Sequence, residues 1–257
     1  MDEHNSVSDP TKIQADLGPN LTLLNLPFMN NNFDPLAHQA AKRGWSHVDY
    51  LSALVDGEAS LRRDRSIERR IRLARFPVKK TLDQFQWSWP TTVNRAAVQH
   101  LFRLKFIEDK SNVVFLGPVG VGKTHLATAL GYAACLQGKS VLFAPAIDVI
   151  NTLSVAQAAN RLKSELRKYL GPSTLILDEL GYLPIDKRGA DLLFQIISLR
   201  YEHGSTIITS NRAYKQWPQI FNNDSTLTSA LLDRLLHHAE TIIIEGRSFR
   251  MKDQIEP

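Results

Sequence analysis

One eight-residue stretch limits the fold of this chain more than any other: residues 117–124 read GPVGVGKT. The spacing G-x-x-x-x-G-K-T is that of a phosphate-binding loop, which connects a strand to a helix. Residues 112–116 (NVVFL) form an apolar, β-branched run that indicates a buried strand before the loop. Residues 124–137 are rich in Ala and Leu and are followed by Gly138, which predicts a helix after it. The motif therefore lies in the context that its chemistry requires.

The residue types of the loop define its chemistry. Glycines allow the backbone to form a nest of N–H groups directed at phosphates, and the following helix adds a positive N-terminal end. Lys123 supplies a cation, and the Thr124 hydroxyl is placed to bind Mg²⁺. We therefore expect a nucleoside triphosphate with Mg²⁺ as the ligand. The residues expected to bind it are Gly117, Pro118, Val119, Gly120, Val121, Gly122, Lys123, Thr124 and His125.

Strand and helix signals alternate from residue 112 onward, which is typical of a parallel sheet with helices on both faces. Five runs are almost wholly apolar or β-branched, as expected of strands buried on both sides. These runs are residues 113–116, 141–144, 174–178, 206–210 and 241–244. The predicted fold class is α/β, a P-loop core with a five-stranded parallel sheet.

Two of the expected strands end in polar residues that suit nucleotide hydrolysis. Asp178 and Glu179 follow one apolar run, and adjacent side chains at a strand end diverge, so the two acids can take different roles. Asp178 fits the Mg²⁺ site beside Thr124, and Glu179 fits the general base that polarises the attacking water. Asn211 follows the strand at 206–210 and is placed to hydrogen-bond that water or the γ-phosphate.

A predicted apolar helix at 227–238 contains a further candidate catalytic residue. Arg234 is suited to neutralise transition-state charge in a neighbouring subunit, and a salt bridge made by Asp233 is the alternative interpretation of this pair. His237 and His238 have no evident metal-ligand companions, so we interpret them as ordinary helix-end residues.

The net charge of +5 is unevenly distributed, because residues 62–80 hold nine basic residues against two acidic ones. Such a surplus favours nucleic acid as a partner, while a solvated helix face and an acidic protein partner are the alternatives. A second basic surface is expected on an extra helix, since residues 147–170 are longer than one crossover helix and predict a break near Ser154. The candidate DNA-binding residues are Arg69, Arg70, Arg72, Lys79, Lys80, Lys163, Arg167 and Lys168.

The residues before the core predict a small helical module. Asp34-Pro35 has the pattern of an N-cap followed by a first-turn proline, in a helix ending near Gly44. Ser46 and Asp49 have the spacing of a capping box that opens the next helix.

We expect a break at Gly57, after which a third helix ends at Phe76-Pro77. The expected domains are a loose tail over 1–20, a basic helical domain over 21–80 and an ATPase domain over 81–257. Phe85 and Trp87 in the connector are interpreted as packing residues, with stacking on adenine as the alternative.

Composition excludes several classes of protein. No apolar run approaches the ~20 residues that span a bilayer, and the polar start at residues 1–5 does not resemble a signal peptide. The single cysteine, Cys135, cannot form an internal disulfide and is expected to be a buried small residue. We therefore expect a cytoplasmic protein.

The segments GPVGVGKTHLA, LILDELGYL, IITSN and LLDRL together resemble the DnaC/IstB branch of the AAA+ ATPases. The segment RRIRLARFPVKKTLDQF resembles more specifically the IstB family, the ATPase helpers of bacterial insertion-sequence transposases. The resemblance covers residues 30–252. It implies ATP as the nucleotide, an AAA+ core, and a homo-oligomer in which Arg234 acts in trans. It also implies sequence-nonspecific binding of duplex DNA, partly through an insertion helix at 155–170, with delivery of target DNA to a cognate transposase and its stimulation.

The C-terminus departs from the family pattern, because only GRSFR follows the last expected strand where a helical lid is usual. Arg250 is then a candidate for the missing lid arginine. Two other functions stay open: a helicase loader of the DnaC type, and a nucleotide-gated DNA-binding protein in which hydrolysis plays no part.

Overall fold

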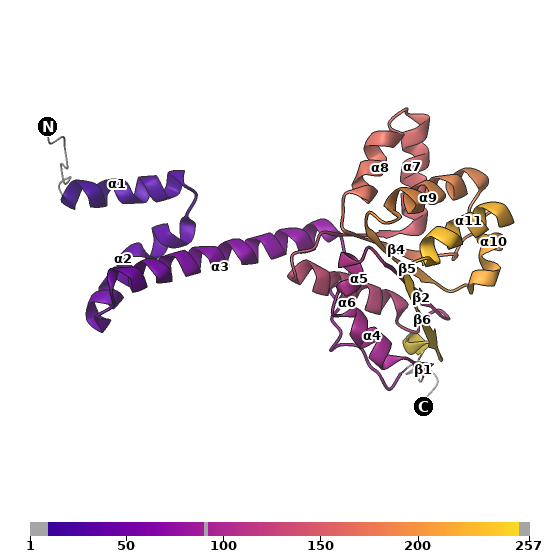
Figure 1. The fold of residues 1–257 in the computed structure, drawn as a ribbon, viewed down its shortest axis with the longest axis horizontal. Coiled ribbons are helices and arrows are strands. Elements are labelled where there is room, and N and C mark those ends of the chain that lie inside the picture. The colour runs from indigo at the N-terminus through magenta and orange to yellow at the C-terminus, as the bar shows by residue number, and fades with distance from the viewer. Residues whose placement is uncertain (1–9, 90–91, 252–257) are drawn as a thin grey trace. The chain divides into compact units, whose positions relative to one another are not determined.

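The computed structural model describes residues 10–89 and 92–251 (Figure 1). The chain divides into two compact units, Met1–Glu68 and Arg69–Pro257, and the boundary between them falls inside a helix. Among the described residues, no helix has both the length and the apolar character needed to cross a membrane.

Three helices build the N-terminal unit: α1 (Pro10–Leu23), α2 (Pro27–Arg43) and α3 (His47–Ala74). The capping box is confirmed, since the Ser46 N–H donates to Asp49 Oδ2 (3.0 Å) and the Asp49 N–H donates to Ser46 Oγ (3.1 Å). The predicted end of α2 is also confirmed, because Gly44 caps this helix in a left-handed conformation. α1 begins at Pro10, within the stretch expected to be a loose tail; residues 1–9 lie outside the described residues.

Two predicted helix boundaries in this unit are wrong. Pro35 lies inside α2, which instead begins with Pro27. Gly57 lies inside a continuous α3. A Cβ atom at Gly57 would lie 1.9 Å from the Phe28 ring, so this glycine allows α2 and α3 to approach closely instead of breaking the helix.

The second unit contains a six-stranded sheet with the order β1-β6-β2-β5-β4-β3. β6, β2, β5, β4 and β3 are parallel, and the short β1 pairs antiparallel with β6 at the edge. The five predicted strands are confirmed, each within two residues of its predicted ends. The strands are β1 (Thr92–Val93), β2 (Asn112–Leu116), β3 (Val141–Pro145), β4 (Thr174–Leu180), β5 (Ser205–Ser210) and β6 (Ala239–Glu245).

Helices cover both faces of this sheet (Figure 1). One face packs against α4 (Arg95–Leu101), α5 (Lys105–Glu108) and α6 (Lys123–Leu136). The other face packs against α7 (Ala146–Ala158), α8 (Leu162–Leu170), α9 (Lys187–Arg200), α10 (Trp217–Ile220) and α11 (Ser225–Leu236). Burial on both sides explains why the central strands are almost wholly apolar.

The extra helix between the second and third predicted strands is present as α8, but its predicted start is wrong. α7 continues through Ser154 to Ala158, and residues 159–161 separate it from α8. Val155 and Gln157 extend the helix because nothing in this stretch interrupts the backbone hydrogen bonds.

Buried Arg200, the last residue of α9, connects three elements by donating to backbone carbonyls. Its guanidinium donates to Tyr169 O at the end of α8 (2.8 Å), to Pro172 O (3.0 Å) and to Ser205 O at the start of β5 (2.6 Å). Burial lowers the pKa of Arg200 to about 10, so the side chain is still charged at neutral pH. These bonds hold the C-terminal end of α9 against the sheet.

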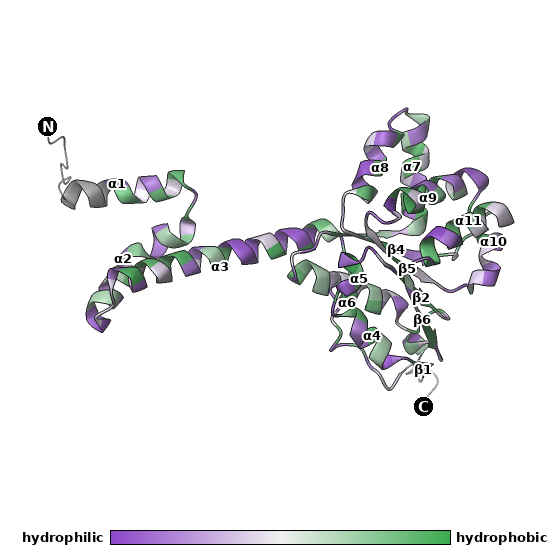
Figure 2. Ribbon diagram, in the orientation of Figure 1, coloured by the Kyte–Doolittle hydropathy of each residue, from purple (hydrophilic) through white to green (hydrophobic). Residues whose placement is uncertain are grey.

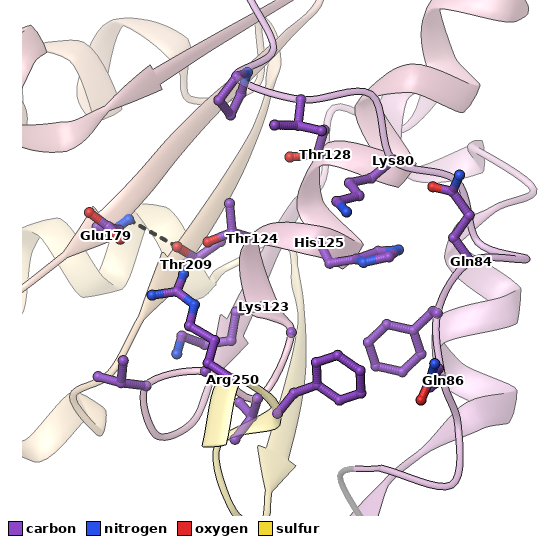
Figure 3. Close-up of a pocket in the computed structure, with 18 of the residues that line it drawn as sticks. Lys80, Gln84, Gln86, Lys123, Thr124, His125, Thr128, Glu179, Thr209 and Arg250 are labelled. Atoms are coloured by element: carbon purple, nitrogen blue, oxygen red, sulfur yellow. Dashed lines mark hydrogen bonds between the residues drawn. The ribbon is translucent and has the colours of Figure 1, made fainter. Parts of the chain in front are cut away.

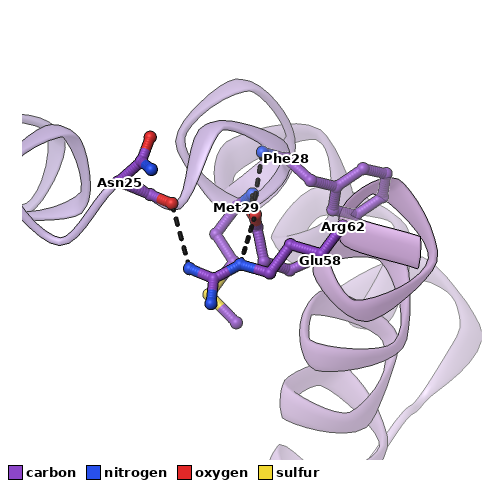
Figure 4. A network of polar contacts seen from close by, with 5 residues as sticks. All are labelled: Asn25, Phe28, Met29, Glu58 and Arg62. Carbon is purple, nitrogen blue, oxygen red and sulfur yellow. Dashed lines mark hydrogen bonds and ion pairs between the residues drawn. The ribbon is translucent and has the colours of Figure 1, made fainter. Parts of the chain in front are cut away.

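A second buried charge organises the N-terminal unit. The Glu58 carboxylate, on α3, is 4% exposed and accepts hydrogen bonds from the Phe28 N–H (2.8 Å) and the Met29 N–H (3.2 Å). These amides belong to the first turn of α2, where helical partners are missing and a negative charge is favoured. Arg62 lies 3.6 Å from Glu58 and donates to Asn25 O (Figure 4). One carboxylate thus substitutes for the missing side-chain cap of α2.

We expect Glu58→Gln to destabilise the N-terminal unit by ~1–3 kcal/mol, because two hydrogen bonds to a buried charge are weakened. Hydrogen exchange at the Phe28 and Met29 amides of the full chain should become faster. Glu68→Gln is the matched control, since Glu68 is exposed on the same helix, and it should change stability by no more than ~0.5 kcal/mol. Equal exchange rates in the two variants would show that Glu58 does not cap α2.

Candidate nucleotide-binding site

The glycine-rich segment forms a tight loop between β2 and α6, as predicted. Gly120 and Gly122 have φ angles of 80° and 97°, which L-amino acids with a side chain rarely adopt. A Cβ atom at Gly120 would also lie 2.1 Å from Ser248 Oγ. The loop therefore requires glycine for its backbone conformation and for the close approach of the chain's C-terminal segment.

Lys123 begins α6, and its side chain folds back across the loop. Its Nζ donates to Gly117 O (2.8 Å) and Pro118 O (2.6 Å). Partial burial lowers the pKa of Lys123, while Asp178 and Glu179 oppose this shift through their negative charge. The ammonium group is thus held at the mouth of the loop, where a phosphate would compete for its hydrogen bonds.

Thr124 and Asp178 are 54 residues apart in sequence, and the fold brings them into contact. Thr124 Oγ1 donates to Asp178 Oδ1 (2.9 Å). The Asp178 carboxylate is 5% exposed and sits near the end of β4. A buried carboxylate beside a hydroxyl is an oxygen-rich donor set of the kind that Mg²⁺ prefers. The fold therefore places the two predicted metal ligands together.

Glu179 diverges from its neighbour, as the sequence predicts, and a backbone irregularity adds to this divergence. The pairing of β4 with β5 shifts register between Leu177 and Leu180, which is the mark of a β-bulge. Glu179 lies in this bulge with φ 58°, and its side chain is exposed at the cavity. The strained conformation directs Asp178 inward and Glu179 toward solvent.

Thr209 is a site residue that the sequence analysis missed. Its hydroxyl donates to Asp178 Oδ1 (2.5 Å) and accepts a hydrogen bond from the Glu179 N–H (2.9 Å; Figure 3). One buried threonine on β5 thus positions both acids. The available signal was a polar residue within an apolar strand, two residues before the predicted Asn211.

Asn211 follows β5 and lines the same cavity. Its Oδ1 atom is buried and has no hydrogen-bond partner among the described residues. A buried amide oxygen of this kind is costly unless a ligand or water completes it. Asn211 therefore lines the same cavity as Lys123 and Glu179.

The cavity beside the loop has a volume of about 730 Å³, within the usual size range for small-molecule and cofactor sites. One wall of the cavity is formed by the connector between α3 and β1, whose aromatic residues the sequence predicts mainly as packing residues. Its lining residues from that connector include Lys79, Lys80, Gln84, Phe85, Gln86 and Trp89.

Phe85 packs in the connector, as predicted, and it also lines the cavity. Its side chain is 6% exposed, packs edge-on against Trp87 (5.0 Å between ring centres) and also lines the cavity. His125 lies against the same ring (5.4 Å), and its Nε2–H donates to Thr81 O (2.9 Å). Burial lowers the pKa of His125, which favours a neutral imidazole at this wall.

The C-terminal segment reaches the loop as well. After β6, the described residues form one short 3₁₀ turn (Phe249–Met251), and no lid helix is present up to residue 251. The Phe249 N–H donates to Gly120 O (2.9 Å). The Arg250 side chain extends from this turn into the cavity toward Lys123 (Figure 3).

Arg234 does not line this cavity. It lies on α11, where its guanidinium donates to Ala230 O (3.1 Å) and stacks over the Phe194 ring (4.9 Å). The fold therefore separates this predicted catalytic residue from the P-loop of its own subunit. Within its own subunit, Arg234 thus contacts α11 and α9 and not the nucleotide cavity.

The candidate DNA-binding residues fall into three groups. Lys79 and Lys80 line the cavity, with Lys79 Nζ above the Tyr132 ring (4.9 Å). Arg69 and Arg72 are exposed on α3, whereas Arg70 is half-buried. Figure 2 shows α3 as a mixture of hydrophilic and hydrophobic residues along its length.

On α8, the three basic candidates are all exposed. Lys168 forms an ion pair with Glu165 (2.7 Å), which leaves Lys163 and Arg167 as its exposed cations without an ion pair among the described residues. The structure thus presents exposed basic residues on both α3 and α8.

The strand order, the P-loop and the two acidic residues near the end of β4 together define an AAA+ nucleotide-binding core. A family model described as IstB-like ATP binding protein matches residues 19–257, and the chain belongs to this family.

Relatives of similar length support this assignment. The chain is 41% identical, over 91% of its length and 88% of the relative's, to a protein of Pseudomonas aeruginosa named as the ATP-binding protein of insertion sequence IS21. It is 38% identical, over 90% and 92%, to the corresponding protein named for IS5376 of Geobacillus stearothermophilus.

Solved structures show the same fold. The DnaC helicase loader aligns with a TM-score of 0.52 and 24% identity, over 64% of this chain and 96% of that chain. AMPPCP-bound DnaA from Aquifex aeolicus aligns with a TM-score of 0.56 and 21% identity, over 70% of this chain and 54% of that chain.

Proposed function

We propose that this protein is an ATPase that binds ATP and Mg²⁺ in the cavity beside residues 117–124 and hydrolyses ATP to ADP and phosphate. The observation that carries the proposal is the contact of the P-loop Thr124 with buried Asp178, with Glu179 exposed at the same cavity. The family's description as ATP binding and the nucleotide analogue in the DnaA structure support ATP as the ligand. The unpaired Asn211 Oδ1 supports the fit of a ligand here.

Each residue then has a defined task. Lys123 exchanges its two carbonyl contacts for phosphate oxygens, and the Thr124 hydroxyl and Asp178 carboxylate hold the metal. When bound there, Mg²⁺ would supply positive charge against the negative charge of the triphosphate. Glu179 orients and polarises the attacking water, and Asn211 hydrogen-bonds the same water or the γ-phosphate. Thr209 keeps both acids in position through its two hydrogen bonds.

The arginines of the site come from two sources. Arg250 contacts the nucleotide within the same subunit, because it already extends into the cavity. Arg234 acts on the nucleotide of a neighbouring subunit, since α11 holds it outside its own cavity. Hydrolysis therefore depends on a homo-oligomer.

Duplex DNA is the proposed macromolecular partner, bound without sequence preference. The exposed arginines on α3 and the exposed cations on α8 suit contacts to phosphates, which carry no sequence information. Relatives named for insertion sequences favour a role in transposition over helicase loading. In this role the protein delivers target DNA to its cognate transposase and stimulates it.

Glu179→Gln should keep ATP affinity close to that of the unchanged protein and lower the hydrolysis rate by ~10²–10⁴-fold, because the amide cannot act as a base. Lys123→Ala should instead lower ATP affinity by ~10–100-fold through loss of a charged hydrogen-bond donor. Binding of a fluorescent ATP analogue and release of phosphate measure the two effects. Turnover of Glu179→Gln at the unchanged rate would reject Glu179 as the base.

Arg234→Ala should bind ATP normally and lose ~10³-fold or more in DNA-stimulated hydrolysis. A mixture of Arg234→Ala with Lys123→Ala should recover part of the activity, since one variant supplies an intact P-loop and the other an intact arginine. Co-purification of one variant, carrying an affinity tag, with the other on duplex DNA checks that mixed assemblies form. Mixed assemblies that are inactive would reject action in trans.

Arg69→Glu with Arg72→Glu should weaken binding to duplexes of any sequence and reduce the salt dependence by ~0.9 log unit per lost phosphate contact. Arg70 is left unchanged because it is half-buried. The control, Arg103→Glu with Lys105→Glu, changes the charge equally at exposed positions outside the proposed surface. Equal salt slopes for the two double variants would place the DNA elsewhere.

A further inference from the structure

The C-terminal ends of two helices of the second unit, α9 and α11, lie close together although the helices are separated in sequence. α9 ends at Arg200, and Glu202 lies in the turn that follows it. α11 ends at Leu236, with His237 as its C-cap and His238 next. One ligand atom from each of Glu202, His237 and His238 lies within 4.8 Å of the other two. Glu202 is thus a candidate metal ligand beside the two histidines that the sequence did not reveal. Our interpretation of these histidines as ordinary helix-end residues is therefore incomplete.

The side chains of this cluster are partly held in place. The Tyr201 hydroxyl and His237 Nδ1 are hydrogen-bonded (2.8 Å), which orients the imidazole and leaves its Nε2 available. The His237 and His238 rings are 4.1 Å apart between centres. Glu202 has φ 58°, a left-handed conformation that turns the chain sharply after α9. A metal-binding histidine characteristically has its second nitrogen bonded in this way.

The local field favours a cation. Helix C-termini carry partial negative charge on carbonyl groups without helical partners, and here two such ends converge on one cluster. The Glu202 carboxylate adds a full negative charge. On α11, Arg234 lies over the Phe194 ring of α9, and the neighbouring Asp233 offsets its charge at Tyr201.

We propose that Glu202, His237 and His238 bind a divalent transition-metal ion, with Zn²⁺ as the representative ion. Two imidazoles and one carboxylate match the preferences of zinc and neighbouring transition metals, whereas Mg²⁺ prefers oxygen ligands alone. Bonds of ~2.0–2.1 Å in a tetrahedron require ligand atoms ~3.3 Å apart. All three side chains are exposed, so small rotations close the remaining distance, and water fills the fourth position.

The ion would join the C-terminal ends of α9 and α11. α11 carries Arg234, which already rests on α9 through Phe194. Metal binding would therefore stabilise the packing of α11 against α9, where Arg234 lies. It would add no group to the nucleotide cavity. The site is separate from the Mg²⁺ ligands Thr124 and Asp178.

The test is a titration of the full chain, prepared without a histidine tag, with ZnCl₂ in the presence of excess Mg²⁺. We expect one equivalent to bind, and Co²⁺ in its place to give the visible absorption of a nitrogen- and oxygen-bound ion. Glu202→Gln and His238→Ala should each weaken binding at least ~10-fold, and Tyr201→Phe by about 10-fold, as loss of an outer hydrogen bond does.

His203→Ala is the matched control, because His203 is exposed in the same turn but bonds to Tyr201 O instead of joining the cluster. Zn²⁺ should raise the melting temperature of the unchanged chain and of this control, and not that of Glu202→Gln or His238→Ala. Unchanged affinity in those two variants would overturn the proposal. Loss in His238→Ala alone, with Glu202→Gln and Tyr201→Phe unaffected, would also overturn it, since binding would then need only a histidine pair.

Discussion

The hydrogen bond between Thr124 and Asp178 is the interaction on which the rest of the site depends. It joins the first turn of α6 to the end of β4 and so connects the P-loop to the acid-tipped strand. β5 lies between β2 and β4 in the sheet, and its Thr209 completes the connection from the middle strand. The polar residues at the C-terminal ends of three neighbouring parallel strands thus lie together. A ligand site is expected at this end of the sheet in such folds.

The divergence of Asp178 and Glu179 shows how a local irregularity separates two chemical roles. A regular strand would also alternate these side chains, but the bulge after Leu177 adds a left-handed residue and leaves Glu179 exposed while Asp178 stays buried. The cost of this conformation is offset by the hydrogen bond from the Glu179 N–H to Thr209. The buried acid suits metal binding, and the exposed acid suits contact with water.

The charged residues outside the cavity have different structural roles. Glu58 caps a helix, and Arg200 holds chain segments together through carbonyl oxygens. Arg234 and the cluster of Glu202, His237 and His238 are instead on the surface formed by α9 and α11. This surface therefore carries both Arg234, the proposed trans-acting arginine, and the proposed metal site.

The sequence by itself determined the P-loop, the five parallel strands and the two acids, because these features are encoded by short contiguous patterns. Buried strands need apolar runs, and a phosphate-binding loop needs glycines at set positions. The capping box at Ser46 was predictable for the same reason.

The features that depend on contacts between residues distant in sequence became apparent only in the tertiary structure. Gly57 continues a helix because Phe28 packs on it, and Thr209 matters because β5 lies beside β4. The connector's Phe85 becomes a cavity wall only once it packs next to the P-loop. Likewise, the two histidines gain Glu202 only when α9 and α11 end side by side. Contacts of this kind arise from packing, which no local pattern of residue types records.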